Sequence, residues 1–166
     1  MEKNIHSIKI AYAFNPNRRG AHYTIDNIHF MNHGEFCEIL TKSVLGFTLT
    51  KSPLPYDRGS DIPEIEASVK SNRFTLVNAN LGNTLVEAVA RYFETTHSKL
   101  WIYTIFTGNA ITLYKMNSAE FKEFLLQFCY MNKRGRVRCR AISAKMLQWL
   151  EGKCPHATGK SKKFLI

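Results

Sequence analysis

The stretch "SDIPEIEASVKS", residues 60–71, carries three carboxylates and one lysine. Asp61 opens it, and Glu66, Ser68 and Lys70 then alternate with apolar residues. Carboxylate oxygens are ligands that Mg²⁺ prefers, and a lysine ammonium stabilises negative charge on a reacting phosphate. These residue types are the ones that a metal-dependent phosphodiester hydrolase requires. The alternative is a solvated strand face without a chemical role.

A strand would position these side chains. The alternation predicts that three apolar residues point to one side of it, while Glu66, Ser68 and Lys70 point to the other. A turn-rich approach with two prolines and a glycine precedes Asp61. A turn through the following "PE" would bring Asp61 within reach of Lys70.

An Asp, a strand with a lysine, a helix and an apolar strand follow one another between residues 34 and 115, an order that resembles the PD-(D/E)xK nuclease superfamily. Ser68 departs from its motif, because it stands where the family has Asp or Glu. A subset of restriction endonucleases looks like this, with SxK on the strand and a glutamate supplied by the next helix. Glu87 matches that glutamate. The resemblance implies that Asp61 and Glu87 hold Mg²⁺ and that Lys70 assists the attacking water.

Other carboxylates compete for these roles. Glu66 is the direct competitor of Glu87, since it needs no relocation from strand to helix. Asp57, in "PYDRGSD", is the alternative to Asp61. Upstream, Glu35 and Glu38 on an expected helix could add a carboxylate to the site, or could merely solvate that helix.

The charge of the chain indicates a polyanionic partner. Lys and Arg number 23 against 13 Asp and Glu, which gives a formal net charge of +10. We expect double-stranded DNA. The candidate contacts are four arginines of "NKRGRVRCR" and two nearer the site: Arg134, Arg136, Arg138, Arg140, Arg73 and Arg58. In a strand from Val137, three of them would share one face; a charge-protected edge strand is the alternative.

The periodicity of the chain predicts an α/β fold. We expect strands at about 8–14, 65–71, 99–106, 110–116 and 136–142, and helices at 34–46, 83–96, 118–132 and 143–152. These predict a mixed central β-sheet flanked by helices, in a single domain over 1–166 with a basic, flexible tail at about 153–166. The resemblance sharpens this to a restriction-endonuclease-like fold. The four scattered cysteines predict buried, reduced thiols.

The hydropathy of the chain predicts a cytoplasmic protein without a membrane partner, because it has neither a long apolar run nor a signal-peptide start. The resemblance, together with the net charge of +10, implies a Mg²⁺-dependent DNA endonuclease of the type II restriction kind. A homodimer is expected, since cutting both strands needs two symmetric sites. A structure-selective nuclease and a non-catalytic basic DNA-binding protein stay open. The recognition sequence depends on loop geometry that periodicity does not determine.

Overall fold

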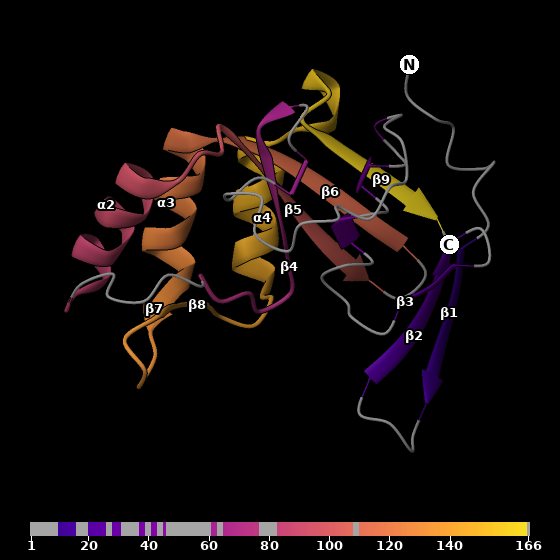
Figure 1. The fold of residues 1–166 in the computed structure, drawn as a ribbon. Helices are drawn as coiled ribbons and strands as arrows, with labels where there is room; N and C mark the ends of the chain where they lie inside the picture. Colours follow the sequence, from indigo (N-terminus) through magenta and orange to yellow (C-terminus); the bar gives the residue numbers. More distant parts are fainter. Residues whose placement is uncertain are drawn as a thin grey trace.

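A computed structural model gives the fold of the chain (Figure 1). It describes residues 10–15, 20–25, 28–30, 37–38, 41–42, 45, 61–62, 65–76, 83–107 and 110–165. Strands β1 (Ile10–Asn15), β2 (Gly20–Ile25) and β3 (Ile28–Phe30) form an antiparallel sheet in that order. The strand expected at 8–14 is thus confirmed as β1.

A second, four-stranded sheet has the order β4-β5-β6-β9. Its strands are β4 (Ala67–Ser71), β5 (Leu100–Thr107), β6 (Ala110–Asn117) and β9 (Ser161–Leu165). β4 and β5 are parallel, and the other two pairs are antiparallel. A parallel pair needs a crossover connection, which helix α2 (Leu85–Thr95) supplies. The expected mixed α/β architecture is confirmed.

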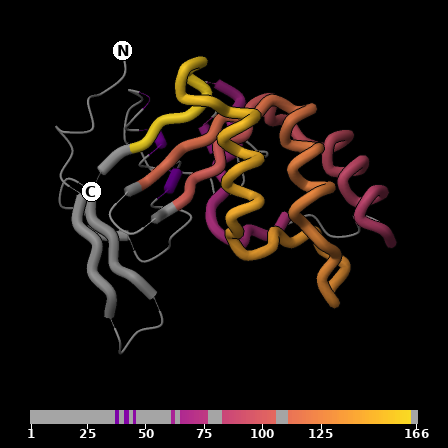
Figure 2. Tube along the Cα trace, turned by 180° about the vertical axis from the view of Figure 1, so that it is seen from behind, coloured from indigo at the N-terminus to yellow at the C-terminus, as the bar shows by residue number. Residues whose placement is uncertain are grey.

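Helices α2, α3 (Ser118–Phe128) and α4 (Ala144–Lys153) lie side by side, with α3 between the other two (Figures 1 and 2). Thr84, Asn117 and Ser143 cap their first turns, because each side-chain oxygen accepts a backbone N–H that has no partner within the helix. None of these described helices has the length and apolar character required to cross a bilayer.

The core lies between the helices and β5, and it is rich in aromatic rings. Trp101 stacks on Phe121 with ring centroids 5.1 Å apart, and its Nε1 donates to the Tyr92 hydroxyl at 2.9 Å. Residues 101–105 of β5 are all buried. This confirms the prediction that the apolar run at 99–106 is a central strand covered on both faces.

Two segments differ from the expectation. The helix expected at 118–132 ends at Phe128, because β7 (Cys129–Met131) pairs with β8 (Val137–Cys139) in an antiparallel hairpin. The segment expected to be a flexible tail carries a short helical turn, η3 (His156–Thr158), and then β9. β9 is held by its ladder with β6, in which Leu113 faces Lys162. The adjacent Lys162 and Lys163 suit such an edge strand, because charged side chains there discourage pairing with another chain.

Candidate functional site

Asp61 is anchored beside the start of β4. Ile62 and Ala67 form an isolated antiparallel bridge, with both N–H···O distances near 3 Å: 3.0 Å and 3.1 Å. This bridge folds the chain back so that the Asp61 carboxylate accepts from the Val69 N–H at 2.7 Å and from the Ser68 hydroxyl at 3.4 Å. The turn expected between Asp61 and the strand therefore forms, and Asp61 lies next to Ser68.

Glu38 meets Asp61 from an upstream helical segment. The Asp61 carboxyl group lies close enough to that of Glu38 to act on its pKa through charge and hydrogen bonding. Burial, followed by the charge and the hydrogen bond of Asp61, raises the pKa of Glu38 to about 8, and the charges of Lys42 and Lys70 oppose this rise. The raised pKa favours the protonated form of Glu38, because a second negative charge beside Asp61 is unfavourable in this half-buried place. The upstream carboxylate considered for this site is thus in contact with Asp61.

Two lysines complete the cluster. Lys70 projects from β4 and is half-buried, whereas Lys42 is buried with 6% of its surface exposed. Lys42 follows Glu38 by one helical turn, so the two share a helix face. A hydrogen bond between the Cys37 thiol and Ser71 connects this segment to β4. Burial raises the pKa of that thiol to about 12.

The cluster of Glu38, Lys42, Asp61, Ser68 and Lys70 is hereafter the carboxylate site. A divalent cation could bind its acidic oxygens in place of the proton that the raised pKa of Glu38 favours. Mg²⁺ is commonly held by one or two carboxylates together with waters and substrate phosphates, so the oxygen donors present fit this ion. Among the described residues no three His, Cys, Asp or Glu side chains converge. A cation here would therefore need ligands from water and substrate as well.

Glu66 does not lie on the expected strand face. It precedes β4 in a turn with a φ of 50°, so the strand begins only at Ala67. Its exposed carboxylate pairs with Lys99 at 3.2 Å. Its carbonyl accepts from the Lys99 N–H at 2.8 Å. These contacts join the turn to the approach of β5 and direct the Glu66 carboxylate to a lysine outside the carboxylate site.

Glu87 lies in the first turn of α2 and is exposed. Its carboxylate accepts from the Asn83 N–H at 3.2 Å, while its own N–H donates to Thr84 Oγ1 at 3.2 Å. An acidic residue in the first turn of a helix commonly makes such capping contacts, since its carboxylate accepts from N–H groups that have no partner within the helix. The described contacts of Glu87 thus lie at the helix start, whereas those of Asp61 lie with Glu38, Ser68 and Val69.

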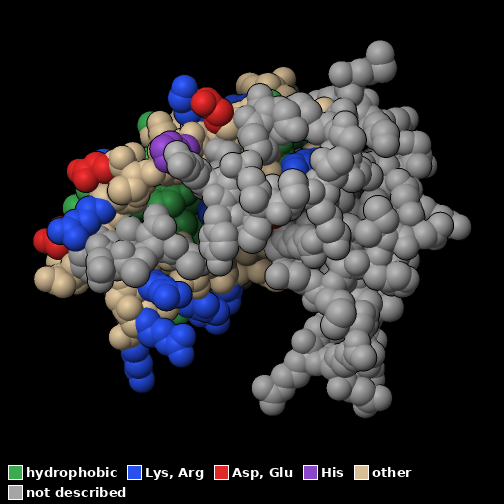
Figure 3. All heavy atoms as spheres, viewed as in Figure 1, with side chains coloured by type: hydrophobic (Ala, Val, Ile, Leu, Met, Phe, Trp, Pro, Cys, Tyr) green, Lys and Arg blue, Asp and Glu red, His purple; other side chains and the backbone are tan. Residues whose placement is uncertain are grey.

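A second, basic surface surrounds the β7–β8 hairpin. We call it the basic hairpin and define it by Arg73, Tyr130, Lys133, Arg134, Arg136, Arg138 and Arg140. Figure 3 shows Lys and Arg side chains gathered on the lower side of the described surface, where Figure 1 places this hairpin. Val137 and Cys139 are buried, whereas the three arginines that alternate with them are half-buried or exposed. The predicted shared face of Arg136, Arg138 and Arg140 is confirmed.

Contacts within the basic hairpin order its face. The Arg140 guanidinium lies 4.9 Å from the Tyr130 ring centroid, and Arg73 Nη2 donates to the Tyr130 hydroxyl at 3.2 Å. Arg138 Nη1 donates to Thr75 Oγ1 at 3.0 Å. No ion pair between described residues includes an arginine of this surface. Its positive charge is therefore not neutralised by the carboxylates of the described chain.

The chain itself connects the two surfaces. Arg73 follows Lys70 by three residues, so their Cα atoms are at most about 11 Å apart. After Arg73 the chain joins the hairpin, because the Leu76 N–H donates to the Val137 carbonyl and the Cys139 N–H to the Phe74 carbonyl, both at 2.9 Å. The basic hairpin is thus attached to the strand that carries Lys70.

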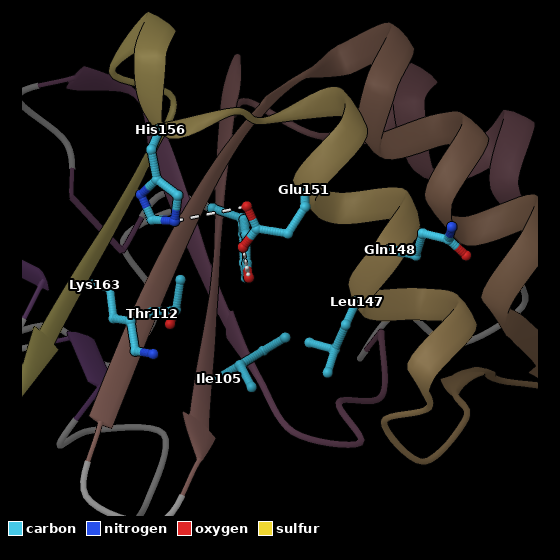
Figure 4. Close-up of a pocket in the computed structure, with 8 residues that line it drawn as sticks. Ile105, Thr112, Leu147, Gln148, Glu151, His156 and Lys163 are labelled. Atoms are coloured by element: carbon cyan, nitrogen blue, oxygen red, sulfur yellow. Dashed lines mark hydrogen bonds and ion pairs between the residues drawn. The ribbon is translucent and has the colours of Figure 1, made fainter.

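A separate pocket lies between α4 and the far end of the sheet (Figure 4). At its centre the Glu151 carboxylate accepts from the Tyr114 hydroxyl at 2.6 Å and faces His156 Nε2 at 3.6 Å. Burial, followed by the Glu151 hydrogen bond, raises the pKa of Tyr114. None of the predicted site residues lines this pocket, and its polar contacts join α4, β6 and η3.

Asp61, Ser68, Lys70 and Glu38 are all candidates from the sequence, whereas Lys42 is not among the predicted residues. The spacing of Glu38 and Lys42 by four residues in an expected helix was the available signal. Arg58, Asp57 and Glu35 lie outside the described residues. Comparisons of the chain with family models, curated proteins and solved structures find no match.

Proposed function

We propose that the chain is a Mg²⁺-dependent endonuclease that hydrolyses phosphodiester bonds in double-stranded DNA and acts as a homodimer in a restriction system. The proposal includes a restriction-endonuclease-like arrangement of the mixed sheet. The observation that supports it most is the contact between the carboxyl groups of Glu38 and Asp61 beside Lys70. A half-buried acidic pair costs folding free energy, and functional sites are where such costs are commonly found.

In this proposal Glu38 and Asp61 hold the ion, and Glu38 takes the place first considered for Glu87 or Glu66. Bound Mg²⁺ would polarise the scissile phosphate and lower the pKa of a coordinated water. Val69 N–H and Ser68 Oγ fix the Asp61 carboxylate through the two hydrogen bonds described above. Ser68 fills the motif's acidic position without charge and supports its neighbour.

Lys70 acts on the phosphate. Its ammonium lies close enough to Glu38 to lower that group's pKa, so it also lies close to any phosphate bound at the carboxylate pair. There it stabilises the negative charge that develops in the transition state and orients the attacking water. Lys42 is more buried and balances the charge of the two carboxylates.

The basic hairpin supplies the DNA-binding surface. Its exposed arginines and Lys133 suit phosphate oxygens, and Arg136 and Arg140 flank the half-buried Arg138 on the same face. Because this surface joins β4 three residues after Lys70, DNA on the hairpin passes near the carboxylate site. Two such sites, one per subunit, would cut the two strands.

Incubation of supercoiled plasmid with the protein and MgCl₂ tests the proposal. We expect discrete fragments from the wild-type chain, no cleavage with EDTA, and none by Glu38→Gln or Asp61→Asn. Glu66→Gln and Glu87→Gln are matched controls, since each removes one carboxylate outside the carboxylate site. Both should cleave like the wild type.

Other outcomes would replace the proposal. Full activity of Glu38→Gln with loss in Glu66→Gln or Glu87→Gln would move the second carboxylate to that residue. Cleavage confined to branched DNA would identify a structure-selective nuclease. DNA binding without any Mg²⁺-dependent cleavage would identify a basic DNA-binding protein whose carboxylates are structural.

A further inference from the structure

Two cysteines face each other across the β7–β8 hairpin. Cys129 begins β7, Cys139 ends β8, and the strand register pairs them directly. Both are free thiols, with 4% and 0% of their surface exposed. Each thiol shifts the pKa of the other, upward at Cys129 and downward at Cys139. The nuclease proposal makes no use of this pair.

The backbone hydrogen bonds show which kind of ladder position the pair occupies. Asn132 N–H donates to the Arg136 carbonyl, and Arg140 N–H donates to the Phe128 carbonyl, both at 2.9 Å. These bonds alternate along the ladder, so the intervening Cys129 and Cys139 form a non-hydrogen-bonded pair. Side chains are closest at such pairs, with Cα atoms about 4.5 Å apart. A disulfide spans Cα separations of about 4.4–6.8 Å, so it can form here without moving the strands far.

The surroundings of Cys139 favour its thiolate. The hydrogen bond from Cys129 lowers its pKa most, and burial opposes this. The Tyr103 hydroxyl, whose oxygen lies 3.9 Å from the Cys139 sulfur, and the charges of Arg73 and Arg138 lower the pKa further. Cys129 has the opposite environment, because its hydrogen bond to Cys139 and burial both raise its pKa. One sulfur is thus the nucleophile, and the other retains its proton.

We propose that Cys129 and Cys139 are an oxidation site for hydrogen peroxide, which converts them reversibly into a cross-strand disulfide. The Cys139 thiolate attacks one peroxide oxygen, the O–O bond breaks, and a sulfenic acid and hydroxide are formed. The Cys129 sulfur then attacks the sulfenic sulfur, and its proton leaves with the second hydroxide as water. Two thiols thereby lose two electrons and two protons, and one peroxide becomes two waters.

The other two cysteines, Cys37 and Cys154, have different surroundings. Cys154 Sγ donates to the Lys115 carbonyl at 3.1 Å, and burial raises its pKa to about 11. The Cys37 thiol is hydrogen-bonded to Ser71, and burial raises the pKa of Cys37 to about 12. Both sulfurs are therefore held as protonated thiols. They serve as internal controls within the same chain.

A disulfide at this position would close the loop that contains Lys133, Arg134 and Arg136. It would join the C-terminal end of α3, which reaches Phe128, to β8. Closing a loop removes conformational freedom from the unfolded chain, so the oxidised protein should melt at a higher temperature than the reduced protein.

Thiol mapping of the folded full-length chain tests the proposal. The protein is treated with hydrogen peroxide, remaining thiols are alkylated in denaturant, and the mass is measured before and after dithiothreitol. We expect two of the four thiols to be lost and both to return on reduction. Trypsin cuts after Lys133 and Arg138, so the disulfide should link peptide 123–133 to the dipeptide 139–140.

Single variants separate the two roles. Cys129→Ser should stop at a sulfenic acid on Cys139 that dimedone traps, whereas Cys139→Ser should stay unoxidised at Cys129. The double variant Cys37→Ser/Cys154→Ser should form the same crosslink as the wild type. Four intact thiols after treatment of the wild-type chain, or a crosslink between other cysteines, would overturn the proposal. Because the measurement counts thiols, its result is independent of DNA cleavage.

Discussion

The carboxylate site and the basic hairpin concentrate charge in different ways. In the first, the acidic pair of Glu38 and Asp61 is partly withdrawn from water and faces two lysines from different segments. In the second, arginines alternate along one short strand, and no ion pair between described residues neutralises them. Mixed, partly buried charges suit chemistry at one point, and unneutralised, exposed charges suit binding along a polyanion.

The largest expected effect separates chemistry from binding at Lys70. Lys70→Ala should lower the rate of Mg²⁺-dependent DNA cleavage by about 10²–10³-fold, because it removes a group that stabilises transition-state charge. The measurement is single-turnover cleavage at saturating protein. Lys99→Ala is the matched control, since Lys99 pairs with Glu66 outside the site and should retain the wild-type rate. An equal loss of cleavage rate in Lys70→Ala and Lys99→Ala would contradict a distinct chemical role for the carboxylate site.

The basic hairpin should affect binding more than chemistry. Arg134→Ala/Arg136→Ala should weaken DNA binding by roughly tenfold for all sequences, and should lower the slope of log K against log salt by about 2. The single-turnover rate at saturation should stay unchanged. Titration of labelled duplex at several salt concentrations measures both quantities. An unchanged salt slope would exclude these arginines as phosphate contacts.

Mg²⁺ should stabilise the folded chain through the carboxylate site and not through the basic hairpin. Mg²⁺ at ten times its dissociation constant adds about 1.4 kcal/mol to the free energy of unfolding, or about 3–6 °C in Tm for a chain of this size. Differential scanning fluorimetry should show this rise in the wild type and in Glu66→Gln. It should be absent in Glu38→Gln, which keeps the shape of the side chain but loses its charge. A full rise in Glu38→Gln would remove Glu38 from the ion's ligands.

The smallest expected effect divides the arginines of the hairpin. Arg138→Ala removes the hydrogen bond to Thr75 and should lower the free energy of unfolding by about 1 kcal/mol. Arg134→Ala changes an exposed residue at the turn and should stay within about 0.5 kcal/mol of the wild type. Urea unfolding measures both. Equal free energies of unfolding for the two variants would show that Arg138 contributes no more to stability than Arg134.

Much of the fold follows from local pattern. The apolar run of β5 predicts its burial, and the helical patterns at 83–96 and 143–152 predict α2 and α4. α3 begins at Ser118, as the helix expected at 118–132 predicts, and Asn117 caps it in a capping box with Glu120.

Local sequence pattern predicts less of the candidate site than of the fold. Glu66 follows the alternating pattern, yet its φ of 50° places it in a turn where the strand was expected. The end of α3 shows the same limit, because β7 forms only where β8 is available to pair with it. Strand pairing depends on partners that periodicity within one segment does not identify.

The sequence by itself determined the strand that carries Ser68 and Lys70, the nearby Asp61, and the shared face of the hairpin arginines. These depend on residues close in the chain, where the two-residue period of a strand decides direction. Only the tertiary structure decided that Glu38 meets Asp61, that Glu66 turns to Lys99, and that Cys129 faces Cys139. Each of these contacts joins separate segments, and its formation depends on how those segments pack.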